Sequence, residues 1–275
     1  MTETDFSVLL PTYGGDDATE LDQSLRSCFE QTRLPSEVLI VEDGPLTEEL
    51  TATLTDWKKQ YPDRLRRIRI PENRGLGNAL NRGVKECTYS LIARHDSDDI
   101  NVRTRFERQI AYFNDHPDVD IVGGYIGEFS RDPSAVKTVR KVPTDHDSIE
   151  AMARFRSPMN HGTVMFRKGA VLAAGNYRAV TRIEDYDLWV RMFCSDATFA
   201  NIPDILVKVR AGAGLAERRG GAEYARAEVR RQVEFYRRGF IGFPVFVFNV
   251  VSRVGLRFLP NRIRRWVYRT VARES

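Results

Sequence analysis

Four short apolar runs in the first hundred residues alternate with stretches in which apolar residues recur at helical spacing. The runs are Phe6 to Leu10, Glu37 to Val41, Leu65 to Ile70 and Tyr89 to Ala93. Two parallel strands need a long crossover between them, and that crossover is usually a helix. The alternation therefore predicts an α/β protein with an open, mostly parallel, doubly wound sheet and helices on both faces.

Polar residues follow the predicted strands at the point where each strand ends. Open α/β sheets bind their ligands at this carboxyl edge. Such a crevice would offer an aromatic ring and a carboxylate to a base, an arginine to phosphate and acids to a metal. The alternative is that turns are polar simply because they are exposed. The residues expected to gather at the edge are Pro11, Thr12, Tyr13, Glu42, Asp43, Arg74, Asp96, Ser97, Asp98 and Asp99.

The most acidic of these turns reads RHDSDDI, from Arg94 to Ile100. Carboxylates held close together repel one another unless a cation lies between them. Mg²⁺ and Mn²⁺ favour oxygen ligands and usually complete their shells with water and substrate phosphates. The turn therefore predicts a divalent metal site that awaits a diphosphate. In the alternative interpretation, Asp98 or Asp99 caps the helix expected from about Arg103.

A second acidic segment, IEDYDLW, runs from Ile183 to Trp189. The apolar spacing predicts a helix from about Tyr186 to Phe193, which would place Asp185 at its N-cap. A carboxylate at the rim of a donor site can instead take a proton from an incoming hydroxyl. The two interpretations are compatible with each other.

The second half of the chain adds elements beside the parallel sheet. His161 lies in the loop SPMNHG, directly before a predicted strand, although a lone histidine is more often structural than catalytic. We expect antiparallel strands here that build an acceptor-side wall. The two antiparallel strands would be Asp120 to Gly127 and Val136 to Val142. The other predicted elements are a helix at Arg103 to Asn114, a strand at Thr163 to Phe166 and a strand pair or extended segment at Phe199 to Val209.

The positive charge of the chain belongs to its C-terminal tail. The net charge is +4, but the segment from Arg253 onward has seven arginines and one acid, which leaves the rest of the chain at −2. A nucleic-acid enzyme is expected to carry a basic stripe across its body, so no nucleic-acid partner is predicted. Arginines among aromatic residues suit an anionic membrane surface.

The tail itself is apolar but interrupted. The run from Phe240 to Leu259 is broken by Pro244 and Asn249 and carries arginines, so it is too short and too charged to span a membrane. Beyond Pro260, an amphipathic helix that includes Trp266 would lie in the membrane interface. Alternatively, the two helices pack on the domain or on a second subunit. Residues 210–221 read as a basic loop, either a lid over a diphosphate or a linker.

Three cysteines, Cys28, Cys87 and Cys194, are widely spaced and fit neither a disulfide framework nor a zinc site. This pattern suggests a reducing cytoplasm. The N-terminal apolar run has no basic region before it, so we expect a first strand rather than a signal peptide. Together with the tail, these features predict a cytoplasmic protein that is peripheral on the inner face of the cell membrane.

Six segments, taken in order, resemble the family 2 glycosyltransferases, which have the GT-A fold. The resemblance extends to about Arg210. Each segment alone is weak, whereas their shared order is specific. The segments are SVLLPTYGG, IVEDGP, NRGLGNALNRG, RHDSDDI, SPMNHGTVMFRK and IEDYDLWVRM.

The resemblance implies roles for individual residues. Asp43 would contact the nucleotide base, which Pro11, Thr12 and Tyr13 would line, with Glu42, Arg74 and Ser97 in the same donor site. Asp96 and Asp98 would form the D-x-D pair, with Asp98 the firmer metal ligand. His161 would lie near the diphosphate, and Asp185 would be the catalytic base. His95 stands where many relatives carry an apolar residue, which leaves its role open.

By the same resemblance, the protein would be an inverting enzyme that depends on Mn²⁺ or Mg²⁺. It would move a hexose from a UDP-sugar to a lipid-linked saccharide during synthesis of a surface polysaccharide such as O-antigen or exopolysaccharide. Residues 1–222 would form the catalytic domain, with 1–100 binding the nucleotide sugar and 101–222 facing the acceptor. Residues 223–275 would form a basic, helical, membrane-associating region, with 240–275 on the lipid. A homo-oligomer remains open.

Two functions of other classes are compatible with parts of this pattern. A sugar-nucleotide pyrophosphorylase would need a glycine-rich, basic loop after the first strand, whereas the turn here is the acidic PTYGGDD. A membrane-attached binding protein could keep the nucleotide-sugar site without turnover. Such a protein would show no transfer, and Asp185→Asn would change nothing.

Overall fold

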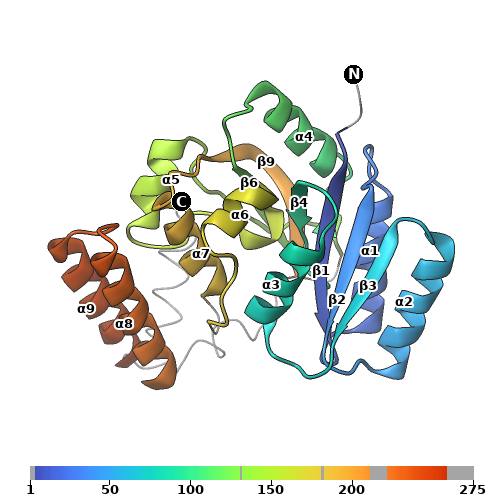
Figure 1. Ribbon diagram of the computed structural model, residues 1–275, viewed down its shortest axis with the longest axis horizontal. Helices are drawn as coiled ribbons and strands as arrows, with labels where there is room; N and C mark the ends of the chain where they lie inside the picture. Colours follow the sequence, from blue (N-terminus) through green and yellow to red (C-terminus); the bar gives the residue numbers. More distant parts are fainter. Residues whose placement is uncertain (1–3, 131, 181–182, 211–221, 259–275) are drawn as a thin grey trace.

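The computed structural model describes residues 4–130, 132–180, 183–210 and 222–258. Within these residues, one nine-stranded sheet has helices on both faces (Figure 1). The strand order is β3-β2-β1-β4-β8-β6-β9-β5, and β7 pairs with β6. The predicted α/β architecture is confirmed. The loop at 211–221 and the helix expected beyond Pro260 lie outside the described residues, and the proposed domain boundary lies at the edge of that loop.

The first four strands form the parallel part of the sheet, as the sequence predicts. Nearly every residue of β1 and β2 is buried, which explains their almost uninterrupted apolar sequence. Tyr13 pairs with Asp43, so both strands end at the same level. The elements are β1 (Phe6–Tyr13), α1 (Ala18–Phe29), β2 (Glu37–Asp43), α2 (Glu48–Gln60), β3 (Leu65–Ile70), α3 (Leu76–Glu86) and β4 (Leu91–Arg94).

The second half extends the sheet with strands of mixed direction. Strand β8 runs antiparallel to both β4 and β6, whereas β9 runs parallel to β6 and antiparallel to β5. The expected antiparallel additions are therefore present. The elements are β5 (Ile100–Asn101), α4 (Arg105–Asp115), β6 (Ile121–Phe129), β7 (Thr138–Arg140), α5 (His146–Ala153), the 3₁₀ turn η1 (His161–Thr163), β8 (Met165–Arg167), α6 (Lys168–Ala173), α7 (Glu184–Phe193) and β9 (Phe199–Arg210).

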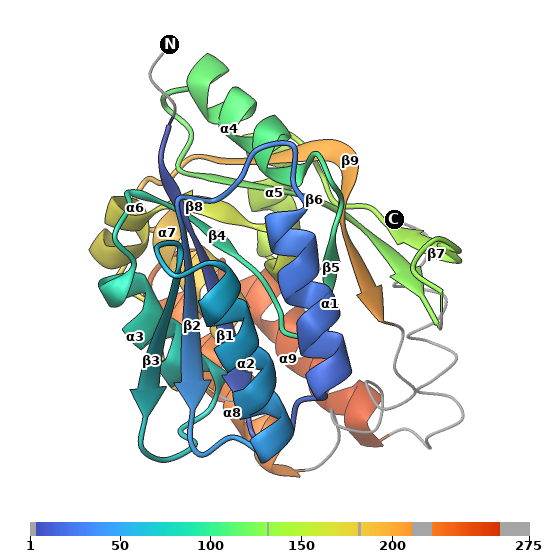
Figure 2. The same ribbon diagram turned by 90° about the vertical axis from the view of Figure 1, so that its right-hand side faces the viewer.

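Two hydrophobic cores fill the spaces on either side of the sheet. In β1, Val8 and Leu10 face the core under α1, α2 and α4, whereas Leu9 faces the core under α3, α6 and α7. This alternation follows from the period of two in a β-strand. Figure 2 shows α1 and α2 in front of the parallel strands, with α3 behind them. The sheet is thereby held rigid on both faces behind its carboxyl edge.

Two helices follow the sheet and form a hairpin, α8 (Ala222–Arg237) and α9 (Phe243–Phe258). The hairpin packs on α7 through a cluster made by Tyr186, Val190, Phe235 and Ile241. In the described part of the tail, packing on the domain is therefore what the structure shows. None of the described helices combines the length and the apolar character that a membrane crossing requires.

Pro244 and Asn249 interrupt the apolar run of the sequence, but they do not interrupt helix α9. Pro244 lies in the first turn of α9, where its missing N–H has no helical partner to lose. The amide of Asn249 is buried and donates hydrogen bonds to the side-chain oxygen of Gln232 and the carbonyl oxygen of Arg154, both at 2.9 Å. The polar residue therefore fastens α9 to α8 instead of ending it.

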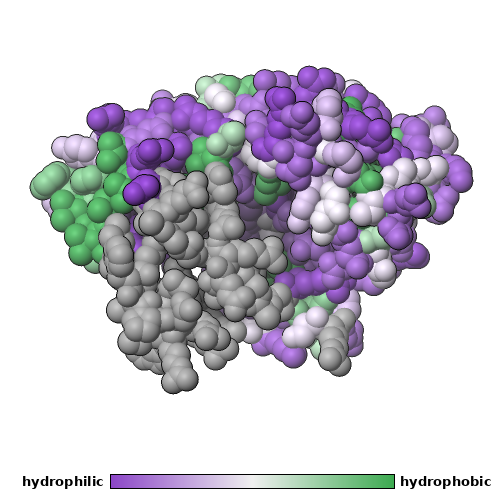
Figure 3. Space-filling view, turned by 90° about the horizontal axis from the view of Figure 1, so that it is seen from below, coloured by the Kyte–Doolittle hydropathy of each residue, from purple (hydrophilic) through white to green (hydrophobic). Residues whose placement is uncertain are grey.

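Large apolar side chains remain exposed on the hairpin and on the loop beside it. Figure 3 shows hydrophobic surface gathered over these helices at the left edge of the molecule. Phe243 and Phe248 are each 61% exposed. We call this surface the apolar patch, and its residues are Phe155, Tyr236, Phe243, Val247, Phe248 and Val251.

Helix α3 holds the loop that precedes α7. The side-chain amide of Asn81 donates to the carbonyl oxygen of Tyr177 at 2.6 Å, and that of Asn176 donates to the carbonyl oxygen of Asn81 at 3.0 Å. Gly77 allows this approach, because a Cβ there would lie 2.2 Å from the carbonyl oxygen of Arg178. The loop is thus fixed against a helix from the other half of the chain.

Gly77→Ala should lower the free energy of unfolding by about 1 to 3 kcal/mol, because the new methyl group would overpack a backbone contact. Gly169→Ala is the matched control, since a Cβ at this helical position meets nothing within 4 Å, and it should leave stability unchanged or raise it by up to about 1 kcal/mol. Urea unfolding followed by circular dichroism measures both variants. Equal stability of the two would contradict the close contact.

Candidate active site

The carboxyl edge of the parallel strands brings the first and fourth predicted turns together. Strand β4 pairs with β1 only as far as Leu9, so the turn after Arg94 lies beside the last residues of β1. Pro11 lies beyond the end of β4, where β1 needs no donor on that side, and it pairs with Val41 of β2. Tyr13, the last residue of β1, exposes 45% of its surface.

Asp16 joins these two turns. One oxygen of its carboxylate accepts hydrogen bonds from the hydroxyl of Thr12 at 2.8 Å, the backbone N–H of Tyr13 at 3.2 Å and the hydroxyl of Ser97 at 2.7 Å. Sequence reasoning missed Asp16. The acidity of its turn was visible, but nothing local indicates a contact with a residue 81 positions away.

The second strand end carries Asp43, which organises the loop before α3. Its two carboxylate oxygens accept hydrogen bonds from the backbone N–H groups of Arg74 at 2.9 Å and Gly75 at 2.8 Å. Gly75 has a φ of +86°, a conformation that favours glycine. The structure thus brings Asp43 and Arg74 together through the backbone, and the Arg74 side chain is largely exposed.

The carboxylate of Glu42 pairs with two arginines of β3. Its carboxylate is 3% exposed and accepts hydrogen bonds from Arg67 at 2.6 Å and Arg69 at 3.1 Å, both on β3. These contacts make Glu42 a buried partner of the edge strand, and they engage both of its oxygens.

Asp96 forms an ion pair with the buried side chain of Arg94 at the end of β4. Both terminal nitrogens of the guanidinium donate to the two carboxylate oxygens, and the Arg94 side chain is 2% exposed. Buried charges of this kind persist only when they are paired. Asp96 is therefore occupied by an internal cation in this structure.

Asp98 has a different electrostatic environment. Asp98 is exposed at the surface of the turn, yet partial desolvation of its carboxyl group and the nearby carboxylates of Asp96, Asp16 and Glu20 raise its pKa to about 6. Such repulsion is relieved by a cation. Among the described residues, no three acidic, histidine or cysteine side chains form a ligand set on their own. Mg²⁺ sites often use one or two carboxylates with substrate phosphates and water, and Asp98 fits that arrangement, whereas Asp96 is engaged by Arg94.

Neither Asp98 nor Asp99 caps the next helix. The chain first extends into β5, which pairs with β9, and α4 begins at Arg105 after Thr104, which makes no side-chain cap. Burial and the charges of Asp96 and Asp98 raise the pKa of Asp99 well above its usual range. Helix capping therefore does not explain the acidic residues of this turn.

His161 and Gly162 lie against this turn. A Cβ on Gly162 would be 3.1 Å from a carboxylate oxygen of Asp99 and 3.2 Å from one of Asp96. The Nε2 atom of His161 lies 2.9 Å from the hydroxyl of Tyr177. Burial and the charge of Arg94 hold the pKa of His161 well below its usual value. The ring is therefore neutral at physiological pH and lies in the same electrostatic field as Asp96.

Asp185 lies in the first turn of α7, which begins at Glu184. The N-cap position belongs to Ile183, so the predicted capping role of Asp185 is wrong. The hydroxyl of Ser157 donates to its carboxylate at 3.2 Å. Burial raises the pKa of Asp185, while the charges of Arg140 and Arg94 oppose that rise. Arg94 thus acts electrostatically on carboxylates from two distant segments, Asp96 and Asp185.

A buried arginine supports the acidic turn from below. Arg105 is fully buried and donates to the carbonyl oxygens of Arg94 at 2.8 Å and Val164 at 3.3 Å, which ties the end of β4 to the strand beside it. His95 is also fully buried, with its Nδ1 atom 3.5 Å from Arg105. Burial and the charges of Arg105 and Arg94 lower the pKa of His95 well below its usual value. His95 is therefore an uncharged residue of the core.

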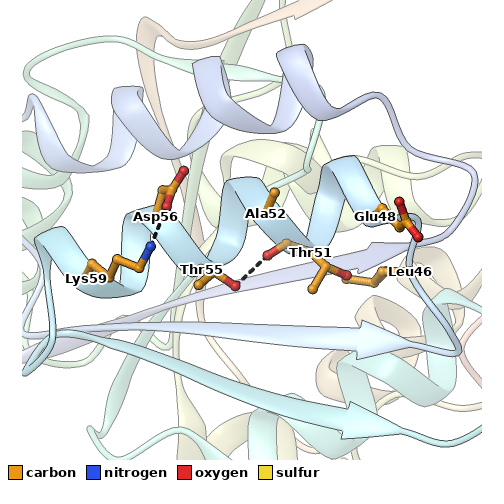
Figure 4. Close-up of a pocket in the computed structure, with 7 residues that line it drawn as sticks. All are labelled: Leu46, Glu48, Thr51, Ala52, Thr55, Asp56 and Lys59. Carbon is orange, nitrogen blue, oxygen red and sulfur yellow. Dashed lines mark hydrogen bonds and ion pairs between the residues drawn. The ribbon is translucent and has the colours of Figure 1, made fainter.

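Two open grooves lie away from these residues. One, of about 440 Å³, runs along α2 between Leu46 and Lys59 (Figure 4). The other, of about 620 Å³, lies between α1 and β5. Neither contains a predicted site residue, and Figure 4 shows mostly small and charged side chains along one helix, without convergent polar groups.

The family model described as Glycosyl transferase family 2 matches residues 7–173, more than half of the chain. The chain belongs to glycosyltransferase family 2. The matched segment contains each predicted site residue except Asp185, and the predicted family is confirmed.

Relatives within glycosyltransferase family 2 align over almost the whole chain. An uncharacterized glycosyltransferase of Haemophilus influenzae is 39% identical, over 98% of this chain and 99% of its own. The UDP-Gal:alpha-D-GlcNAc-diphosphoundecaprenol beta-1,3-galactosyltransferase of Escherichia coli is 35% identical, over 98% and 96%. The amylovoran biosynthesis glycosyltransferase AmsE of Erwinia amylovora is 36% identical, over 96% and 97%.

Solved structures of low sequence identity share the fold. TarS 1-349 of S. aureus in complex with UDP has a TM-score of 0.67 and 16% identity, over 96% of this chain and 74% of that chain. The mannosyltransferase PcManGT of Pyrobaculum calidifontis in complex with GDP-Man and Mn²⁺ has a TM-score of 0.65 and 17% identity, over 100% and 77%. The predicted GT-A fold of this glycosyltransferase is confirmed.

Glu184→Gln should flatten the decline of stability with rising pH. Burial and the neighbouring Asp185 raise the pKa of Glu184 to about 7. A carboxyl group whose folded pKa is raised binds more protons in the folded state, so its presence lowers stability as pH rises from about 5 to 8. Urea unfolding at several pH values should show the variant more stable at pH 8 by about 1 to 3 kcal/mol.

Glu49→Gln serves as the control for this substitution, because Glu49 is exposed on the first turn of α2. It should leave both the stability and its pH dependence within about 0.5 kcal/mol of the wild type. If the stability of Glu184→Gln depends on pH as that of the wild type does, the pKa of Glu184 is not raised in the folded protein.

Proposed function

We propose that this family 2 enzyme is an inverting, metal-dependent glycosyltransferase. It moves a hexose from a UDP-sugar to a lipid-linked saccharide in the synthesis of a bacterial surface polysaccharide. The observation that supports the proposal is that Arg94 pairs with Asp96 and that its charge also opposes the rise in the pKa of Asp185, as expected if the acidic turn and the first turn of α7 face one site. Separate carboxylates for the leaving group and for the attacking hydroxyl are what the reaction needs.

The donor half of the proposal rests on the ends of β1 and β2. The exposed ring of Tyr13 offers a stacking face for a base, and Asp43 shapes the loop that carries Arg74. An exposed guanidinium at that position suits a diphosphate. The relative from E. coli is named for UDP-Gal, and the S. aureus structure holds UDP, which favours a uridine nucleotide.

The metal half rests on Asp98, with Asp96 beside it. Asp98 has the raised pKa of a carboxylate that gains from a cation, and Mg²⁺ or Mn²⁺ would be held there together with the diphosphate. When bound, the ion supplies Lewis-acid stabilisation to the leaving diphosphate. Arg94 keeps Asp96 in place, and Ser97 anchors the turn through Asp16.

The base is Asp185. Its partial burial raises its pKa towards the range in which a carboxylate accepts a proton from a hydroxyl. The acceptor hydroxyl gives its proton to Asp185, and its oxygen forms a bond to the anomeric carbon. The bond from that carbon to the diphosphate oxygen breaks on the opposite face, so the configuration inverts without a covalent enzyme intermediate.

The acceptor half rests on the apolar patch. The relatives from E. coli and Erwinia amylovora are named for a diphosphoundecaprenol-linked acceptor and for amylovoran biosynthesis. The apolar patch lies on the hairpin that packs against α7, and the sequence beyond Arg253 is rich in arginine. An apolar face flanked by basic residues suits the surface of an anionic membrane. The protein then acts at the inner face of the cell membrane.

A panel of nucleotide sugars, supplied with a lipid-linked acceptor extract and Mn²⁺ or Mg²⁺, tests the proposed transfer. The wild type should consume a UDP-hexose. Asp185→Asn should reduce the rate of transfer at least about 100-fold, because the base contributes 10²–10⁴-fold, while metal-dependent UDP binding persists. Asp98→Ala should instead abolish the metal dependence of UDP binding, measured by calorimetry.

Full transfer activity in Asp185→Asn would remove the base assignment. If the protein instead converts a nucleoside triphosphate and a sugar phosphate into a nucleotide sugar and pyrophosphate, it is a pyrophosphorylase. The absence of any turnover would identify a binding protein.

The double variant Phe243→Ser/Phe248→Ser should bind anionic vesicles at least about ten-fold more weakly, because two exposed aromatic side chains lose their burial in lipid. Co-sedimentation of the full-length chain with vesicles of phosphatidylglycerol and phosphatidylcholine measures the effect. Leu34→Ser/Leu172→Ser, at apolar side chains exposed elsewhere, is the matched control and should bind like the wild type.

Unchanged vesicle binding of the phenylalanine variant would contradict the membrane assignment. A wild-type dimer that dissociates on the same substitutions, in analytical ultracentrifugation, would assign the apolar patch to a second copy of the chain.

A further inference from the structure

Tyr177 lies inside the site, although the sequence singled out neither the residue nor its segment. It is 1% exposed and lies in the loop that α3 holds before α7. Its hydroxyl is 2.9 Å from the Nε2 atom of His161. The His161 ring also packs edge-on against Trp189, with 5.8 Å between the ring centroids. The histidine is thus held by two buried aromatic side chains.

The hydroxyl of Tyr177 keeps its proton. Burial raises the pKa of Tyr177, and the negative charges of Asp185, Glu184 and Asp96 raise it further. A buried phenol must give that proton to an acceptor, because leaving a buried donor unpaired costs about 1 to 3 kcal/mol. The hydrogen bond that the structure describes for this hydroxyl is the one to Nε2 of His161, so Tyr177 is the donor in it.

A neutral imidazole carries one proton, and the nitrogen that accepts a hydrogen bond cannot hold it. His161 is neutral, because burial and Arg94 hold its pKa well below the usual value. With Nε2 accepting from Tyr177, the proton of His161 resides on Nδ1. The tautomer is therefore set by a residue 16 positions away in the chain.

We propose that Tyr177 is a positioning residue that fixes His161 as the Nδ1–H tautomer, so that the ring presents a hydrogen-bond donor to the diphosphate of the nucleotide sugar. The second part rests on the proposed function. A phosphate oxygen accepts hydrogen bonds, whereas the opposite tautomer would aim a lone pair at it. Because the ring does not protonate at physiological pH, only the tautomer decides which of these it offers.

The tautomer can be measured without any activity. In the full-length chain with ¹⁵N-labelled histidine, the two ring nitrogens of a neutral imidazole have well-separated chemical shifts, and long-range ¹H–¹⁵N correlation identifies the protonated one. His161→Gln assigns the signals by removing those of His161 from the set that includes His95, His116 and His146. The wild type should show Nδ1–H at His161, and Tyr177→Phe should shift it towards Nε2–H, the form that free histidine prefers.

Tyr186→Phe is the matched control. Tyr186 is also buried, and its hydroxyl donates to the carbonyl oxygen of Ala153 at 2.6 Å, outside the His161 contact. Both variants lose one buried hydroxyl, so both should lose similar stability in urea unfolding. Only Tyr177→Phe should change the tautomer and weaken UDP binding, by about ten-fold in calorimetry.

An Nε2–H signal in the wild type, or an unchanged tautomer in Tyr177→Phe, would overturn the proposal. A shifted tautomer with unchanged UDP affinity would overturn the assignment of that N–H to the diphosphate. If the wild type binds no nucleoside diphosphate, the proposed function is contradicted, whereas the tautomer result still stands.

Discussion

The ion pair between the buried side chain of Arg94 and Asp96 is the interaction on which the rest of the site depends. A guanidinium that is only 2% exposed must be compensated, and the neighbouring carboxylate does so. The same charge opposes the rise that burial causes in the pKa of Asp185, and it adds to the lowering that burial causes in the pKa of His161. One buried cation at the end of β4 thus interacts with groups from three segments of the chain.

The polar residues of the acidic turn have different partners. Asp96 is paired internally, Ser97 is tied to Asp16, and Asp98 remains among carboxylates that raise its pKa to about 6. The side chains that position the turn come from outside it, since Arg105 holds its backbone from below. The turn therefore combines one carboxylate that is paired internally, Asp96, with another whose raised pKa reflects repulsion, Asp98, the proposed metal ligand.

Helix α7 connects this site to the outer surface. Its first turn carries Glu184 and Asp185, whereas Tyr186 and Val190 pack against the hairpin of α8 and α9. The hairpin in turn exposes the apolar patch. A surface that holds the hairpin would consequently also hold the orientation of the helix that carries the proposed base.

The sequence by itself determined the alternation of strands and helices, the edge at which the polar turns meet and the family, because periodicity and motif order are local properties. Only the tertiary structure decided which side chains pair. Glu42 and Asp96 look alike in sequence as acids at strand ends, yet arginines from β3 and β4 engage them. Asp16, Arg105 and Tyr177 could not be found locally, since their partners are distant in the chain or in other elements. Hydrogen bonds and charges act over a few ångströms of space, and the fold alone sets those distances.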